Sequence, residues 1–203
     1  TLSDPATYEA SPEGEDAKGC FFSEKQLVFS GNGKLNVEGN SKHAICVDDY
    51  VRFLGGEVVI TKALSDGLHA NDYVRMDAGS LKVTSVGECV QCEDNEAAYF
   101  LMTGGEMNLS STGEKCGAVE TASDIIVEGG KLTAYVSGAA AKCLKSNNNL
   151  TIKGGDINLR TSGGGTYDSV ARDASAAACV RAGNLCTIAG GKLVCKSEGA
   201  GGK

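Results

Sequence analysis

A glycine-centred repeat runs through most of the 203-residue chain. Glycine pairs or their equivalents recur at Gly33, Gly56, Gly79, Gly105, Gly130, Gly155 and Gly191, in steps of 23, 23, 26, 25, 25 and 36 residues. A period in the twenties is typical of a solenoid, in which each coil buries its apolar face only against its neighbours. The longer last step indicates an insertion at about residues 162–178.

Short runs of alternating apolar and polar residues flank each glycine step, for example 73–76 and 81–84. Such a period of two is typical of strands. A third run comes half a repeat earlier, at 44–47, 67–70, 143–146 and 179–182. Three strands per coil predict an all-β fold: a right-handed, single-stranded parallel β-helix of about seven coils over residues 27–203, preceded by a polar leader and N-terminal cap at 1–26.

Superposing the coils places apolar residues in columns that we expect to point inward. One column holds Ile45, Leu68, Val90, Val119, Leu144 and Val180; another holds Val37, Ile60, Val83, Leu109, Ala134, Leu159 and Cys195. The nine cysteines show one isolated CxxC spacing, Cys89 to Cys92, which is weak evidence for zinc. We interpret most of them, Cys186 and Cys195 included, as small buried apolar groups.

Composition excludes two classes of function. The net charge of -7 argues against nucleic-acid binding, which needs clustered Lys and Arg to neutralise phosphates. No apolar run approaches the roughly 18 residues that a transmembrane helix requires, so we expect no membrane span. The glycine pairs are interpreted as tight corners, because no helical period follows them to complete a phosphate-binding loop.

Acidic and amide residues form a strip on three successive coils. Equivalent residues of adjacent coils lie about 4.8 Å apart in a β-helix, so stacked side chains are neighbours. The columns of the strip are Asp48, Asn71 and Glu93; Asp49, Asp72 and Asp94; and Asp66 followed by Glu88. Stacked like charges repel, and a calcium ion with oxygen ligands would offset that repulsion. The alternative is a solvated corner, at which Asp and Asn only end the strands.

Beside this strip, Tyr50, Tyr73 and Tyr99 align on successive coils, and Arg52 and Arg75 follow two positions later. Aromatic rings offer apolar faces with a polar tip, and guanidinium groups can hold carboxylates in bidentate fashion. These five residues therefore predict a surface that binds sugars, including acidic ones. In the alternative, the tyrosines stack for stability and the arginines neutralise the acidic strip.

A further outward column contains His69, Gln91, Glu120, Lys145 and Arg181. These residue types mix both charges with neutral polar groups. We interpret the column as an ordinary polar face rather than a ligand site.

The run Ser65-Asp66-Gly67-Leu68-His69-Ala70-Asn71-Asp72, followed by Gly79-Ser80-Leu81 and by the later runs 141–146 and 149–155, resembles a bacterial carbohydrate-binding β-helix family. The resemblance covers about residues 27–203. That family is similar to calcium-binding relatives of family 9 pectate lyases and is associated with cellulose-like and acid-sugar polymers. The resemblance implies calcium as cofactor, an extracellular, cell-surface or periplasmic location, and a set of calcium ligands: Asp66, Asn71, Asp72, Glu88 and Glu93.

Three functions follow as hypotheses. The preferred one is a non-catalytic, calcium-dependent module that binds plant-type or acidic polysaccharide. The second is a polysaccharide lyase, which needs calcium to acidify the proton α to a uronate carboxylate and a lysine or arginine base beside it. Lys115, Lys142 and Lys145 are candidate bases by type, but they lie one or more coils beyond the strip. The third is a surface adhesin or structural solenoid.

Overall fold

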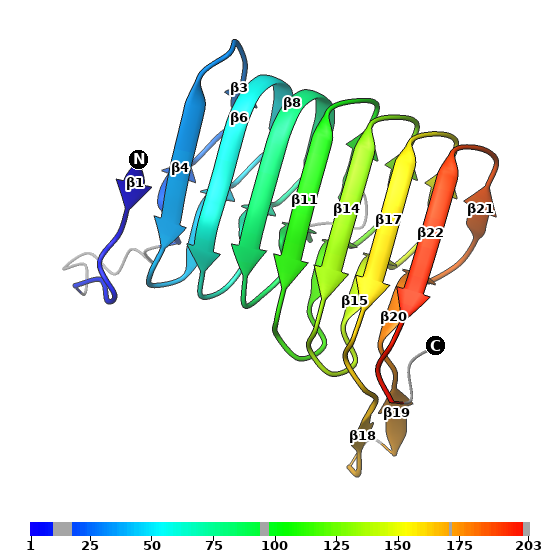
Figure 1. Ribbon diagram of the computed structural model, residues 1–203. Coiled ribbons are helices and arrows are strands. Elements are labelled where there is room, and N and C mark those ends of the chain that lie inside the picture. The colour runs from blue at the N-terminus through cyan, green and yellow to red at the C-terminus, as the bar shows by residue number, and fades with distance from the viewer. Residues whose placement is uncertain (10–17, 94–97, 171, 201–203) are drawn as a thin grey trace.

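The computed structural model describes residues 1–9, 18–93, 98–170 and 172–200. Its described residues form strands and turns without a helix, and the parallel strands stack into a solenoid of about six turns. In Figure 1 the front strands run downwards and succeed one another from left to right, while the chain returns behind them, so the coil is right-handed. No described segment forms a helix with the length and apolar character needed to cross a bilayer.

The smaller of the two main sheets contains seven parallel strands, one from each coil. They are β2 (Gly19–Ser23), β5 (His43–Val47), β7 (Leu68–Ala70), β9 (Val90–Cys92), β12 (Gly117–Thr121), β15 (Lys142–Ser146) and β20 (Ala178–Ala182). We number the coils one to seven by these strands, and the path from the first strand to the seventh makes about six turns. Strand β2 places part of the predicted leader in the first coil, because it pairs directly with β5.

The larger sheet has 13 strands and forms two faces of the solenoid. Its front strands are β4 (Lys34–Gly39), β6 (Val51–Ala63), β8 (Tyr73–Ser85), β11 (Glu106–Ser111), β14 (Lys131–Val136), β17 (Asp156–Thr161) and β22 (Lys192–Ser197). The remaining strands are β1 (Leu2–Ser3), β3 (Leu27–Phe29), β10 (Tyr99–Met102), β13 (Ile125–Val127), β16 (Leu150–Ile152) and β21 (Cys186–Ile188). In coils two and three the two faces join into the continuous strands β6 and β8.

Glycines with positive φ make the corner between these two faces. The left-handed conformation is cheap only for glycine, and it recurs at Gly56, Gly79, Gly105, Gly130, Gly155 and Gly191. In the first coil the residue with positive φ is Gly31 rather than the predicted Gly33. The sheet register still sets Gly33 opposite Gly56, so the prediction found the correct column and the wrong corner residue.

The inward columns form the core, and each member pairs in register with its equivalent on the next coil. Ile45, Leu68 and Leu144 are fully buried. Cys186 and Cys195 are exposed, which corrects the prediction that they are buried. Their strands do pair them with Leu150 and Leu159. Both cysteines are exposed because they lie in coil seven, and among the described residues no further coil covers it.

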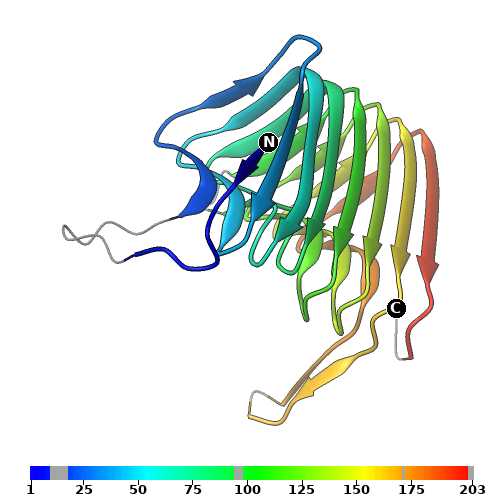
Figure 2. The same cartoon turned by 60° about the vertical axis from the view of Figure 1, so that its left-hand side comes forward.

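A short antiparallel hairpin interrupts the stack between coils six and seven. Its strands are β18 (Thr166–Asp168) and β19 (Asp173–Ser175), and both lie inside the insertion expected at about 162–178. Figure 2 shows the hairpin projecting away from the solenoid, and Figure 1 shows that it lies at the C-terminal end of the stack.

Candidate functional site

Two polar clusters on coils two to four form the candidate site. The histidine cluster consists of His43, Asp66 and His69, and it lies on the outer face of the smaller sheet at β5 and β7. The tyrosine ladder consists of Tyr50, Tyr73 and Tyr99, and it lies just past the corner, where the larger sheet begins. Residues of the predicted acidic strip lie between the two.

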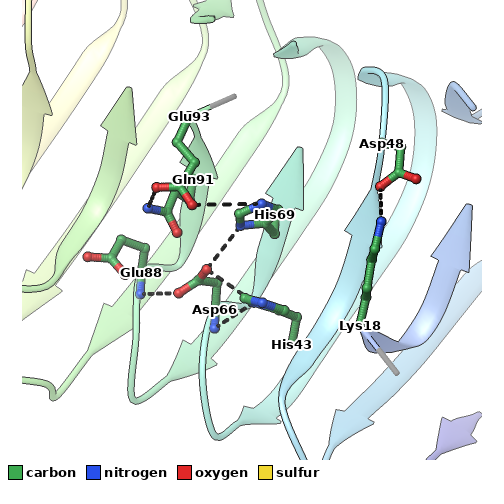
Figure 3. A network of polar contacts seen from close by, with 8 residues as sticks. All are labelled: Lys18, His43, Asp48, Asp66, His69, Glu88, Gln91 and Glu93. Atoms are coloured by element: carbon green, nitrogen blue, oxygen red, sulfur yellow. Dashed lines mark hydrogen bonds and ion pairs between the residues drawn. The ribbon is translucent and has the colours of Figure 1, made fainter. Parts of the chain in front are cut away.

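The histidine cluster converges on one carboxylate oxygen (Figure 3). The Nδ1 atom of His43 lies 3.1 Å from Asp66 Oδ2, and the Nδ1 atom of His69 lies 3.2 Å from the same oxygen. The backbone N–H of Glu88 donates to the other oxygen, Oδ1, over 3.0 Å. Only 3% of Asp66 is exposed, so these groups replace water around a buried carboxylate.

The cluster shifts the pKa values of its members. Burial alone would raise the pKa of Asp66, but hydrogen bonds with His43 and His69 outweigh burial and hold that pKa well below its usual range. Burial would lower the pKa of His69, yet its hydrogen bond to Asp66 and the charges of Asp66 and Glu93 raise it. The geometry therefore favours the ionised form of the Asp66 carboxylate.

The carboxylate of Glu88 belongs to the same column as His43 and Asp66. Burial raises its pKa to about 8, and the negative charge of Asp66 adds to that rise. On the other side, Glu93 accepts a hydrogen bond from Gln91 and lies 4.0 Å from the Nε2 atom of His69. Asp66 thus lies between an acidic neighbour and two imidazoles.

The structure brings together part of the predicted calcium set. Asp66 and Glu88 are adjacent. Asn71 and Asp72 lie at the corner, where their backbone N–H groups donate to the carbonyl oxygens of Val47 and Asp49. Within the described ranges, the group of three metal-ligating side chains close to one another is His43, Asp66 and His69. Asp94 lies outside the described residues. Calcium binding at the five-residue set stays a prediction.

Two members of the acidic strip are paired with lysines. Lys18 donates to Asp48 over 2.8 Å, and Lys25 lies 3.7 Å from Asp49. Next to these pairs, His43, His69, Asp48 and Asn71 line a shallow pocket of about 270 Å³. The pocket is open to solvent at the corner of coils two and three.

Sequence reasoning missed the histidine cluster. The column that contains His69 predicts an ordinary polar face, and no motif in the sequence singles out His43. A signal was present, because His43 precedes Asp66 by 23 residues, the same step that relates Gly33 to Gly56. That spacing does not show that the His69 ring points toward Asp66.

The tyrosine ladder is stacked ring on ring. The ring centroids of Tyr50 and Tyr73 are 4.5 Å apart, and those of Tyr73 and Tyr99 are 4.9 Å apart, with interplanar angles of 5° and 15°. The rings therefore cover one another's faces. Their edges and hydroxyl groups are the parts that a ligand running along the coils can contact.

The two arginines that follow the ladder share one carboxylate. The Nε atom of Arg52 donates to Asp77 over 2.7 Å, and that of Arg75 donates over 2.8 Å; Thr103 donates its hydroxyl to the same group. The hydrogen bond from Arg75, with help from Arg52 and Thr103, lowers the pKa of Asp77 to about 2. The arginines thus neutralise Asp77 on their own face, not the acidic strip as the alternative supposed.

The three candidate lysine bases are engaged elsewhere. Lys145 forms an ion pair with Glu120, and Lys115 lies 4.0 Å from Glu114. Lys142 is buried and donates to the carbonyl of Ala140 and the hydroxyl of Ser175. Burial and the nearby cations lower the pKa of Lys142, but its hydrogen bonds direct it toward the hairpin and away from the site.

Comparison with known proteins gives one match. A model of the family described as "Carbohydrate-binding domain-containing protein" matches residues 1–142, which include both polar clusters. No curated protein and no solved structure matches the chain.

Proposed function

The chain belongs to the family of carbohydrate-binding domain-containing proteins, and from this premise we propose that it is a non-catalytic module that binds polysaccharide across coils two to four. The polymer runs along the solenoid axis, over the tyrosine ladder and the two arginines. Each coil then presents the same kinds of group to successive parts of the polymer.

The ordered array of tyrosines and arginines carries this proposal. Stacking fixes the three rings, and Asp77 fixes both guanidinium groups, before any ligand arrives. A surface ordered in advance loses little conformational entropy on binding. Phenol hydroxyls both donate and accept hydrogen bonds, as the hydroxyl groups of a sugar require.

Charge favours an acidic polymer over a neutral one. Arg52 and Arg75 carry two positive charges against the single negative charge of Asp77, which leaves this group of three side chains with one excess positive charge. Their side chains are 39% and 34% exposed, so they remain accessible to solvent and ligand. Guanidinium groups bind carboxylates through strong charge-assisted hydrogen bonds, and a uronate supplies such a carboxylate.

Calcium dependence is part of the proposal. Burial and the neighbouring negative charge of Asp66 raise the pKa of Glu88, and a cation near the two side chains would favour the ionised form of both. Asn71, Asp72 and Glu93 supply further oxygens along the same edge. Calcium prefers such oxygen ligands and could also bridge to a uronate carboxylate.

Binding without reaction is favoured over lyase chemistry. Lys142 and Lys145, the candidate bases, are held by hydrogen bonds or an ion pair beyond coil four. A lyase would need a lysine or arginine beside the proton that is removed, and the two arginines of the site, Arg52 and Arg75, are both hydrogen-bonded to Asp77. Incubation with pectin decides the point, because a lyase product absorbs in the ultraviolet, and we expect no growth in absorbance.

Retention on immobilised polygalacturonate and on cellulose tests the binding proposal. We expect the parent chain to be retained on the uronate polymer and the double variant Tyr73→Ala/Arg75→Ala to elute earlier. The matched control is Tyr135→Ala/Arg160→Ala, which removes another contacting tyrosine–arginine pair, on the front face, with the guanidinium 5.2 Å from the ring centroid. Equal retention of the parent and the first double variant would place the binding surface elsewhere.

A further inference from the structure

The histidine cluster has the geometry of a metal site that calcium does not explain. Two imidazole Nδ1 atoms lie 3.1 and 3.2 Å from one oxygen of Asp66. In a tetrahedral zinc site with bonds of about 2.0–2.2 Å, neighbouring ligand atoms are roughly 3.3 Å apart. One ligand atom from each of the three residues lies within 4.8 Å of the others. The Nδ1 atom of His43 accepts a hydrogen bond from the backbone N–H of Asp66 over 3.3 Å, so a small movement of both rings that breaks this bond would enclose an ion.

The donor set points to a transition metal. Imidazole nitrogen suits zinc and similar ions, whereas calcium takes oxygen ligands. Two histidines and one carboxylate also match the ligand types of zinc sites that keep an open position.

The surroundings of the cluster hold its ligands in place. The backbone N–H of Glu88 fixes Asp66 Oδ1, which leaves Oδ2 to face both histidines. Glu93 lies 4.0 Å from His69 Nε2, the ring nitrogen opposite the one that faces Asp66 (Figure 3). Partners of this kind orient metal-binding carboxylates and imidazoles.

The fourth position would open into the pocket of about 270 Å³ that both histidines line. Water or an anionic ligand can occupy that space. We therefore propose that His43, Asp66 and His69 bind one zinc-type divalent transition-metal ion, at a site that shares Asp66 with the proposed calcium set and adds two nitrogen ligands that calcium does not need.

Titration of the chelator-treated, reduced full chain with zinc chloride tests this site. We expect one ion per chain by calorimetry and a rise in the melting temperature, because the ion binds the folded state alone. His43→Gln and His69→Gln should each weaken zinc binding by more than the roughly 10- to 100-fold that losing an outer partner costs. Cobalt substitution should give visible absorption typical of a tetrahedral site, without a sulfur-to-metal charge-transfer band.

Matched control variants distinguish zinc binding by the histidine cluster from zinc binding by thiols and from calcium binding. Cys46→Ser alters a residue that lines the same pocket outside the cluster, and Cys186→Ser/Cys195→Ser removes the exposed thiols; both variants should bind zinc like the parent. Without zinc and with added calcium, the retention of His69→Gln on polygalacturonate should equal that of the parent, because calcium takes oxygen ligands and not the imidazole. Absent zinc binding, equal binding in the histidine variants, or loss of binding in either cysteine variant would overturn the proposal.

Discussion

The rings of Tyr50 and Tyr73 lie almost parallel, with centroids 4.5 Å apart and planes inclined by 5°. Since Tyr99 continues the stack on the next coil, Tyr73 is the one ring of the ladder with a ring on both faces. The ladder therefore links three coils by contacts outside the core. Its central position makes Tyr73 the residue on which both the stability and the ligand surface of this face depend.

Removing that central ring should destabilise the fold. Each aromatic pair contributes about 0.5–1.5 kcal/mol beyond its buried area, so Tyr73→Ala should lower the free energy of unfolding by about 1–3 kcal/mol. Tyr73→Phe keeps the stack and should unfold near the parent, while losing part of the sugar binding. Denaturant unfolding measures both variants, and a Tyr73→Ala variant as stable as the parent would contradict the role of the ladder.

Protonation of Asp77 should lower the stability of the folded chain in acid. Its pKa is lowered from 3.8 to about 2, so the unfolded chain takes up the proton first. The stability that Asp77 contributes is therefore fully present above about pH 4 and is lost as the pH falls through about 2. Asp77→Asn should reduce this part of the pH dependence, measured by melting between these pH values. Asp156→Asn, which removes an exposed partner of Lys192, should leave the dependence unchanged.

Millimolar calcium should raise the melting temperature of the chelator-treated chain, because an ion that binds only the folded state stabilises it. Glu88→Gln removes one charged oxygen ligand and should reduce the rise, whereas Lys153→Gln, a change of charge on a distant coil, should not. If calcium leaves the parent's melting temperature unchanged, the acidic strip is a solvated corner.

Alanine should be tolerated unequally at Gly79, which is a corner glycine, and at Gly33, which is not the corner residue of its coil. A Cβ atom at Gly79, where φ is +84°, would lie 2.6 Å from the carbonyl oxygen of Gly56. The left-handed conformation alone costs about 1–2 kcal/mol for a residue with a side chain, and the contact with backbone adds to it. Gly33 has no atom within 4 Å of such a Cβ. Urea unfolding should therefore show a large loss for Gly79→Ala and a small change for Gly33→Ala; similar losses would contradict the corner geometry.

Thiol reactivity should divide the cysteines by their position in the coils. Burial raises the pKa of Cys89 and Cys92 to about 12, so at neutral pH neither forms the reactive thiolate in the folded chain. Cys186 is exposed and should react first with a thiol reagent. Mass spectrometry of the labelled chain checks the order, and Cys186→Ser should remove the fastest reaction. Labelling of Cys92 before unfolding would show that the core opens.

The family match supports one part of the resemblance that the sequence predicted, which is carbohydrate binding. Calcium, the relation to lyases and the location outside the cell stay predictions. The alignment of Tyr50 with Tyr73 and of Tyr73 with Tyr99 followed from the repeat, since a period fixes which residues share a column. The strands do pair Tyr99 with Tyr73 in this register.

The sequence by itself determined the parallel β-solenoid, its glycine corners and the columns of its core, because spacing along the chain sets which residues stack. Only the tertiary structure decided which neighbours those side chains meet. In the folded chain the side chains of His43 and His69 face Asp66, and Arg52 and Arg75 both pair with Asp77. Cys195, in the seventh coil, is exposed. The physical reason is that a period specifies a position on a coil, whereas side-chain direction and burial depend on the atoms that the adjacent coils bring to that position.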